Sequence, residues 1–328
     1  MKKKIFIVVA IIGFLAVGTG LVFKDDISEI ITNKKNAAST LTVANNTSST
    51  EQNKSGESNN EKNGGVTDKE SLENPKKKVV EAKDYAPLVD NIKQYCSDKK
   101  GVYGVYFKSL TSGKEFGINE NEDYVAASTV KVPVNLYLYH EAIKGKVSLD
   151  YGIEYIQDDY EEGCGHIQYG KIGVNFKLRD LSKYSIEESD NVAVNMLIRY
   201  LGRENICSFR EEIVKHAVPR NKNASNPKDM ALYLQYLLDM NKSHPNEGQQ
   251  MLEYLKHTEF NDRIPVYLPK DIEIAHKIGN QVGAVHDVGI VFAKKPFIVT
   301  IMSKDVNESE ANEVIARIAE MIYNYEQK

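Results

Sequence analysis

Two residues three positions apart, Ser128 and Lys131, carry side chains suited to nucleophilic chemistry. They lie in Ser128-Thr129-Val130-Lys131, where a loop pattern changes to a helical one, so both would face the same side of one helical turn. The serine would sit at the positive end of the helix dipole. Acyl transfer needs a nucleophile with a base in hydrogen-bond reach, and a lysine can serve when burial or nearby charge lowers its pKa. The pattern alone also fits a helix N-cap followed by a solvated lysine.

Two more polar motifs follow along the chain. Ser189-Asp190-Asn191 opens a later helical segment, and Lys277-Ile278-Gly279 lies on a segment typical of a strand. The motifs S-x-x-K, S-D-N and K-T-G characterise class A β-lactamases and penicillin-binding proteins. The chain resembles this family in the order, the spacing and the expected setting of the three motifs. The resemblance implies a serine enzyme that reacts at an amide or β-lactam carbonyl.

The resemblance extends over most of residues 85–328. Three further stretches look like a hairpin turn, a helix start and a sheet strand of the family: Thr111-Ser112-Gly113-Lys114, Asn226-Pro227-Lys228-Asp229-Met230-Ala231 and His286-Asp287-Val288-Gly289. Ordered matches along a whole domain are far more specific than a single four-residue motif.

Carried over to this sequence, the family's mechanism gives catalytic roles to three residues. Ser128 would be the nucleophile, Lys131 would accept or relay its proton, and Ser189 would pass a proton to the departing amide nitrogen. Asp190 is expected to be structural instead, because its carboxylate can cap the helix that follows.

The resemblance also implies four substrate-binding residues: Asn191, Lys277, Gly279 and Asn280. Asn191 would bind the side-chain amide of the substrate. Lys277 would supply positive charge near Ser189 and the carboxylate of the substrate. The backbone N–H groups of Ser128 and Asn280 would form the oxyanion hole that stabilises the tetrahedral intermediate.

A feature of class A β-lactamases is missing between the second and third motifs. There the family has a loop with E-x-x-L-N, whose glutamate activates the water that hydrolyses the acyl-enzyme. Here an apparent helix over residues 204–216 leads through a short segment to Asn226-Pro227. Glu211 and Glu212 fall inside the helical pattern and are expected to be solvated. The deacylation base is therefore expected to be absent, which would cost turnover roughly 10²–10⁴-fold.

The third motif also departs from the family. Ile278 stands where the family has Thr or Ser. The missing hydroxyl would bond to the carboxylate of the antibiotic, a charge-assisted contact worth roughly 1.5–3 kcal/mol. Both departures favour an acyl-enzyme that forms and then deacylates poorly, which is the behaviour of a penicillin-binding protein.

A Ser-His-Asp site is the competing chemistry, because triads are defined by geometry and seven histidines are present. No G-x-S-x-G elbow surrounds any serine of the chain. His276 directly precedes Lys277 on the predicted strand, so its side chain is expected on the opposite face of the sheet. None of the histidines needs a catalytic explanation.

Composition narrows the cofactors and partners. Cys96, Cys164 and Cys207 lack metal-ligand spacing, and their odd number leaves at least one thiol unpaired. Cys164 follows Tyr160 where the family has a loop at the cleft entrance, and we interpret it as an ordinary thiol. The net charge of −4 argues against a nucleic-acid partner. We expect a monomer that needs no metal or organic cofactor and that takes a β-lactam or cell-wall peptide as substrate.

The elements that must position these residues change in type along the chain. A helix is expected over residues 85–97, a hairpin over 101–118, and mostly helices over 128–251. Strands are expected again at 273–277, 288–292 and 297–302, and a last amphipathic helix at 308–325. This order predicts an α+β fold, with an antiparallel sheet flanked by terminal helices and an inserted all-helical lobe.

The first 79 residues have a different composition. Residues 1–33 contain an uncharged apolar run at 5–23 behind three lysines, which predicts a membrane anchor or signal with the N-terminus inside. Residues 34–79 are polar and are expected to be a disordered linker. Residues 80–328 would form the serine hydrolase domain. It is expected to be extracytoplasmic, held at the cell membrane by a single-pass anchor, or secreted if the segment is cleaved.

Three functions fit this pattern. The leading hypothesis is a serine hydrolase of class A β-lactamase type that forms an acyl-enzyme and deacylates poorly. The first alternative is a peptidase or transpeptidase acting on cell-wall peptides, like penicillin-binding proteins. The second is a non-catalytic envelope-binding module, for which Ile278 and the missing loop are the support.

Overall fold

The structure of the chain is a computed structural model that describes residues 84–328. The predicted anchor at 5–23 and the predicted linker at 34–79 lie outside the described residues. Within residues 84–328, no helix is both long enough and apolar enough to cross a membrane.

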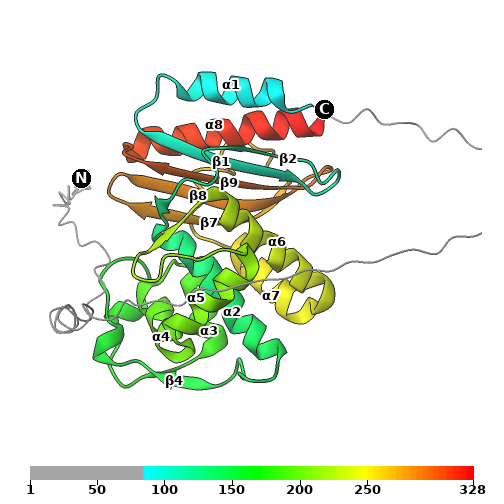
Figure 1. The fold of residues 1–328 in the computed structure, drawn as a ribbon. Coiled ribbons are helices and arrows are strands. Elements are labelled where there is room, and N and C mark those ends of the chain that lie inside the picture. Colours follow the sequence, from blue (N-terminus) through cyan, green and yellow to red (C-terminus); the bar gives the residue numbers. More distant parts are fainter. Residues whose placement is uncertain (1–83) are drawn as a thin grey trace, which may run out of the picture. The chain divides into compact units, whose positions relative to one another are not determined.

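A five-stranded antiparallel sheet forms the centre of the fold (Figure 1). Its strands are β1 (Val102–Ser109), β2 (Glu115–Ile118), β7 (Glu273–Gln281), β8 (Ala284–Phe292) and β9 (Phe297–Lys304). They pair in the order β2-β1-β9-β8-β7, so β7 is an edge strand. The central strand β9 and its neighbour β8 are buried along almost their whole length, which explains their mostly apolar sequences.

Two helices from opposite ends of the described chain cover one face of this sheet. They are α1 (Ala86–Cys96) and α8 (Glu308–Gln327), which lie together above the strands in Figure 1. Leu88 and Ile92 of α1 share an apolar core with Ile315 and Ile318 of α8 and with the sheet. At the start of α8, the side chain of Asn307 accepts the N–H groups of Ser309 and Glu310, which satisfies donors that a helix start leaves free.

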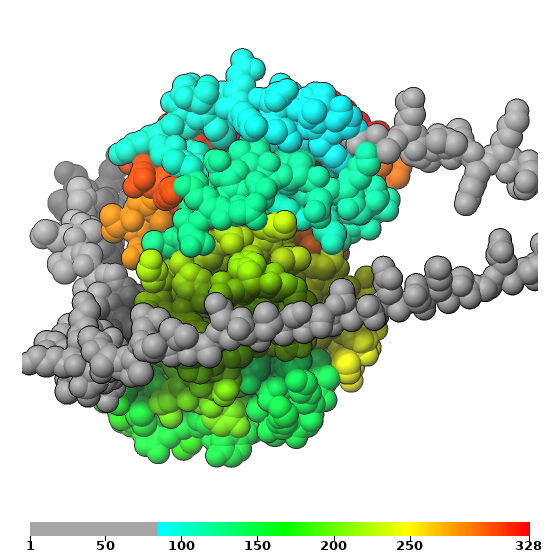
Figure 2. Space-filling model, viewed as in Figure 1, coloured from blue at the N-terminus to red at the C-terminus, as the bar shows by residue number. Residues whose placement is uncertain are grey.

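Helices cover the other face and continue into a lobe. They are α2 (Lys131–Ile143), α3 (Leu178–Glu187), α4 (Asn191–Leu201), α5 (Arg203–Val214), α6 (Pro227–Ser243) and α7 (Pro245–Lys256). Met230 and Leu234 of α6 share a core with Val288 and Ile290 of the sheet. A separate apolar cluster holds α2, α3 and α4 together, with Leu138 and Leu197 at its centre. Figure 2 shows this lobe in green below the blue and teal elements of the sheet side.

The predicted fold class is confirmed, and two details of the prediction are wrong. Short strands interrupt the region predicted as helical: β4 (Gly152–Glu154) pairs with β5 (Asn175–Lys177), and β6 (Ala224–Ser225) pairs with β3 (Tyr124–Val125). Such pairs of two or three residues are too short for a period to be visible in the sequence. The predicted strands at 273–277 and 288–292 are also too short, because β7 and β8 pair from Glu273 with Phe292 to Gln281 with Ala284.

Candidate active site

The turn that carries Ser128 leads directly into α2. It is the 3₁₀ turn η1 (Ala127–Val130), and Lys131 is the first residue of the helix. Ala127 has a φ of 47°, a left-handed conformation that is strained for a residue with a Cβ and is common at functional sites. Asn223 fixes the turn through two hydrogen bonds. Its side-chain Nδ2 donates to the Ala127 carbonyl at 3.2 Å, and its backbone carbonyl accepts the N–H of Ala126 at 2.9 Å. The serine is therefore held at a fixed turn ahead of α2.

Lys131 lies at the centre of the candidate site. Its Nζ is 3.1 Å from Ser128 Oγ, 3.2 Å from Ser189 Oγ, 2.6 Å from the Ser189 carbonyl oxygen and 2.8 Å from Asn191 Oδ1. The side chain is 2% exposed. Lys131 of the first motif and Ser189 of the second are 58 positions apart in sequence, and the two motifs meet at the Lys131 amine.

The environment of Lys131 lowers the pKa of its amine. Burial lowers this pKa to about 8, against opposing contributions from the nearby groups of Cys164, Glu161 and Asp190. A neutral amine beside a hydroxyl can accept the proton of that hydroxyl. The alternative of a solvated lysine after a helix cap is wrong, because the side chain is buried among polar partners.

The second motif is held in a strained but well-bonded turn. Ser189 has a φ of 54°, again in the left-handed region. Asp190 caps α4, since its Oδ1 accepts the N–H of Ala193 at 2.8 Å, and its Oδ2 accepts the N–H of Ile167 at 2.9 Å. The structural role predicted for Asp190 agrees with these contacts. The cap places Ser189 just before the helix, where its side chain meets Lys131.

Lys277 approaches Ser189 from the edge strand β7. Its Nζ donates to Ser189 Oγ at 3.0 Å and to the Ile278 carbonyl at 3.2 Å, and the side chain is fully buried. Burial, followed by the charge of Lys131, holds the pKa of Lys277 well below its ordinary value. A serine hydroxyl has two acceptor lone pairs and one proton. Lys131 and Lys277 each donate a hydrogen bond to one lone pair of Ser189 Oγ, so the hydroxyl keeps its own proton available for donation.

Gly279 allows the nucleophile turn to pack against β7. A Cβ at this position would lie 3.0 Å from both the Ala126 carbonyl oxygen and Thr129 Cγ2. A larger residue would therefore push the turn away from the strand. The side chain of Asn280 accepts a hydrogen bond from Arg263 and donates one to Glu308. These contacts leave the backbone of Asn280 as the part predicted to act, in the oxyanion hole.

The region predicted to lack a deacylation base has its own polar contacts. Glu211 Oε1 accepts the N–H of Val218 at 3.2 Å, and Glu211 Oε2 lies 2.5 Å from a guanidinium nitrogen of Arg220. The prediction that Glu211 is solvated is wrong, because it fastens the segment after α5 to that helix; Glu212 is exposed as predicted. Among the described residues, the hydrogen-bond partners of Lys131 include no carboxylate.

His276 takes part in a buried pair behind β7. Its Nδ1 lies 2.9 Å from Asp287 Oδ1, and its Nε2 lies 3.2 Å from Asn261 Oδ1. The carboxylate of Asp287 also accepts the N–H of Ile264 at 3.0 Å. This His-Asp pair is engaged with an asparagine rather than a serine, so it does not build the competing triad.

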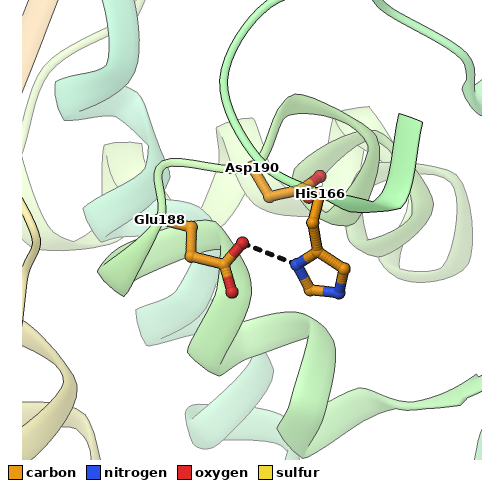
Figure 3. Close-up of side chains that lie close together, drawn as sticks. All are labelled: His166, Glu188 and Asp190. Atoms are coloured by element: carbon orange, nitrogen blue, oxygen red, sulfur yellow. Dashed lines mark hydrogen bonds and ion pairs between the residues drawn. The ribbon is translucent and has the colours of Figure 1, made fainter. Parts of the chain in front are cut away.

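The entrance loop, residues 160–169, lies against the start of α4. Figure 3 shows His166 and Glu188 pointing toward one another, with Nδ1 and Oε2 2.6 Å apart, beside Asp190. These three side chains could in principle hold a metal ion. Both oxygens of Asp190 already accept backbone N–H groups, and the His166 contact fastens the loop to the residue before Ser189. The cluster therefore fits a structural role.

The sequence alone does not identify several residues at the site. Glu161 accepts hydrogen bonds from both Asn191 and Asn195, and Arg263 lies fully buried behind the edge strand, where it donates to the carbonyl of His286 at 2.8 Å. The spacing of Asn191 and Asn195, four positions apart on one helix, was a usable signal. Nothing in the sequence indicates that Arg263 is buried, because its partners are backbone carbonyls and amides.

Comparison with known proteins agrees with this geometry. Residues 87–326 match the model of a family described as the Beta-lactamase enzyme family. The extended-spectrum beta-lactamase PER-1 of Pseudomonas aeruginosa is 24% identical over 274 residues, which cover 74% of this chain and 88% of that protein. The imipenem-hydrolyzing beta-lactamase of Enterobacter cloacae is 26% identical over 254 residues, covering 71% and 86% of the two chains.

The solved structures that resemble this chain include PBP-A and beta-lactamases. The structure of PBP-A superposes with a TM-score of 0.69 at 25% identity, over 73% of this chain and 95% of that one. The beta-lactamase from Sphaerobacter thermophilus DSM 20745 has a TM-score of 0.67 at 24% identity, over 74% and 98% of the two chains. With a family match that spans residues 87–326, the chain belongs to the Beta-lactamase enzyme family.

Proposed function

We propose that the protein is an extracytoplasmic active-site-serine enzyme of class A β-lactamase type, which forms an acyl-enzyme at a β-lactam or peptide amide carbonyl and deacylates it poorly. The observation that carries this proposal is the position of Lys131. Its buried amine lies 3.1 Å from Ser128 Oγ and 3.2 Å from Ser189 Oγ, with a pKa lowered to about 8.

The contacts support an ordered acylation. Ser128 Oγ attacks the carbonyl carbon while its proton passes to neutral Lys131. The oxygen of the tetrahedral intermediate takes the negative charge, which the N–H groups of Ser128 and Asn280 are proposed to stabilise. When the C–N bond breaks, Ser189 donates its proton to the departing nitrogen and regains one from the ammonium of Lys131. The products are an ester on Ser128 and a free amine.

Deacylation needs a water molecule and a base to take its proton. Among the described residues, no carboxylate is hydrogen-bonded to Lys131, and Glu211 is bonded to Val218 and Arg220 instead. We therefore expect the ester to persist, since a positioned base contributes roughly 10²–10⁴-fold to such a step. The structure of a mutant of PBP-A in an acyl-enzyme complex with penicillin G superposes on this chain with a TM-score of 0.69, which supports this expectation.

The second candidate is a peptidase or transpeptidase for cell-wall peptides. The same absence of a placed water-activating carboxylate favours it, because an ester that resists water can still be resolved by an amine of a second peptide. Slow β-lactam turnover together with amine-dependent release of a peptide acyl group would select this candidate over a β-lactamase.

The extracytoplasmic location rests on the sequence of residues 1–33, where three lysines precede an apolar run. In cells, the full-length protein is expected in the membrane fraction, and added protease should remove its C-terminal domain without lysis. Protection from protease in intact cells would contradict this location.

The proposed nucleophile can be tested by locating the adduct. Full-length protein in detergent is incubated with benzylpenicillin and digested, and the modified peptide is sequenced by mass spectrometry. We expect the label on the peptide that contains Ser128, and we expect its loss in Ser128→Ala but not in Ser112→Ala, which lies in an exposed hairpin turn. Label on any other residue would contradict the proposal.

A further inference from the structure

Glu161 places a carboxylate at the mouth of the site. Its Oε1 accepts from Asn191 Nδ2 at 3.3 Å, and its Oε2 accepts from Asn195 Nδ2 at 2.9 Å. The two asparagines are one turn apart on α4, so they orient the carboxylate from one side. Because each oxygen is bonded to a neutral amide, the charge of Glu161 is positioned but not neutralised.

Within residues 84–328, no lysine, arginine or histidine forms an ion pair with this carboxylate; its charge acts at longer range on Lys131, where it opposes the lowering of the pKa by burial. The hydrogen-bond partners of Glu161 are the two asparagines, and the ion pairs of the surrounding elements join other residues, such as His166 with Glu188 and Arg199 with Asp159. Glu161 is half-buried, so solvent screens it less than a fully exposed group. A fixed, unpaired carboxylate of this kind attracts a cation from a ligand.

The opposite end of the site carries a basic side chain. Lys277 is fully buried and touches Ser189 Oγ, and its other hydrogen-bond partner is a backbone carbonyl. A chain of hydrogen bonds connects the two ends through Asn191, Lys131 and Ser189. The site is therefore electrically asymmetric, with Glu161 at one end and Lys277 at the other.

The positions of the proton donor and the nucleophile indicate which part of the substrate lies at each end of the site. The departing nitrogen must reach Ser189 Oγ to receive its proton, and Lys277 contacts that same oxygen. The leaving group therefore lies at the end of Lys277. The acyl group stays on Ser128 and extends the other way, toward Asn191 and Glu161.

We propose that Glu161 is a specificity-determining residue that selects substrates with a protonated amine on the acyl side of the scissile carbonyl. The preferred substrates are then zwitterionic aminoacyl compounds, with an ammonium group near Glu161 and a carboxylate near Lys277. This inference rests on the proposed function for the direction of attack. An acyl group that carries a carboxylate is disfavoured, because that carboxylate and the carboxylate of Glu161 repel one another.

Three penicillins with the same core separate this effect from shape. Ampicillin carries an ammonium on the carbon next to the side-chain carbonyl, benzylpenicillin carries hydrogen there, and carbenicillin carries a carboxylate. For the full-length protein in detergent, we expect acylation rate constants to fall in that order, by about tenfold at each step at low salt. In Glu161→Gln the ratio between the fastest and the slowest acylation rate constant should shrink to about threefold or less, because the charge is gone and one amide acceptor remains.

Two variants serve as matched controls. Glu162→Gln removes a neighbouring, exposed carboxylate, so it should keep the wild-type preference. Glu161→Asp keeps the charge on a shorter side chain and should keep the order of the three compounds. Equal preferences in the wild type and in Glu161→Gln would overturn the inference, as would a wild type that does not distinguish the three penicillins.

A binding measurement separates this inference from the proposed chemistry. Ser128→Ala cannot be acylated at the proposed nucleophile, so the dissociation constants of the three penicillins can be compared by calorimetry. If the wild type forms no adduct but Ser128→Ala binds ampicillin at least about tenfold more tightly than carbenicillin, the proposed function fails and the preference of Glu161 for an ammonium group stands. If adducts form on Ser128 and neither binding nor acylation depends on charge, the proposed function stands and the inference fails.

Discussion

The surroundings of Ser128 differ from those of Glu211. At Ser128, groups from η1 and from the start of α4 surround the buried amine of Lys131, and Lys277 of the edge strand β7 joins them through Ser189 Oγ, with donor–acceptor distances between 2.6 and 3.2 Å. At Glu211, the polar contacts join a helix to the segment that follows it, and none reaches the nucleophile.

The difference separates two halves of a hydrolytic reaction. Forming the ester needs a nucleophile, a base and a proton donor, and the first region brings the candidates for all three together. Breaking the ester with water needs a second base, and the second region uses its carboxylate to fasten a loop. The proposed function therefore implies that acylation and deacylation can be altered independently, and the predictions below test that separation.

Removing the amine of Lys131 should have the largest effect. In Lys131→Ala no group remains within hydrogen-bond distance of Ser128 Oγ to accept its proton, so we expect the acylation rate constant to fall by about 10²–10⁴-fold. The matched control is Lys144→Ala at the exposed C-terminal end of the same helix, which should acylate like the wild type. Stopped-flow measurement with a chromogenic cephalosporin gives both rates. Near-normal acylation by Lys131→Ala would show that another base serves Ser128.

Acylation should also depend strongly on pH. The pKa of Lys131 is lowered to about 8, and the reactive form is the neutral amine, which predominates above that pH. Well below it, the neutral fraction falls about tenfold for each pH unit, and half of the amine is neutral at pH 8, so acylation should slow by about 50-fold between pH 8 and pH 6. The lifetime of the ester, measured over the same range, should change much less because Lys131 does not activate the water. A parallel pH dependence of both steps would contradict the separation.

The convergence of these residues could be predicted only in part from the sequence. The three motifs predict Ser128, Lys131, Ser189 and Lys277 because their types and order are local features of helix starts and a strand. The strain at Ala127 and the packing of that turn on Gly279 depend on tertiary contacts, which no local pattern encodes. The failed expectation for Glu211 has the same cause: a helical pattern predicts a solvated face, but the partner of Glu211 comes from the loop beyond the helix.

A methyl group at position 279 should weaken acylation without removing any functional group. In Gly279→Ala the new Cβ would lie 3.0 Å from the Ala126 carbonyl oxygen and from Thr129 Cγ2, so the turn with Ser128 must shift. We expect acylation about 10-fold slower, since small misplacements of reacting groups are costly, and a loss of about 1–3 kcal/mol in the free energy of unfolding. Gly152→Ala is the control, because its Cβ would meet nothing closer than 4.0 Å. Unchanged acylation in Gly279→Ala would show that the turn tolerates the shift.

Changes at Glu211 should have the smallest effect on the reaction. Glu211→Gln should alter the lifetime of the ester by less than about twofold, because this carboxylate is not the missing water-activating base. It should lower the free energy of unfolding by about 1 kcal/mol through its weakened bonds to Val218 and Arg220. Glu212→Gln, on the exposed face of the same helix, should change neither quantity. A longer-lived ester in Glu211→Gln would assign deacylation to this residue.

The lifetime of the ester tests the central claim most directly. Full-length protein in detergent is mixed with benzylpenicillin, and intact mass is followed over hours for the wild type and for Ser128→Ala. Acylation without efficient deacylation predicts an increase of one penicillin mass that forms in the wild type alone and persists after free drug is removed. Rapid consumption of the drug without a lasting adduct would contradict poor deacylation, because it would require a base that activates water at the site.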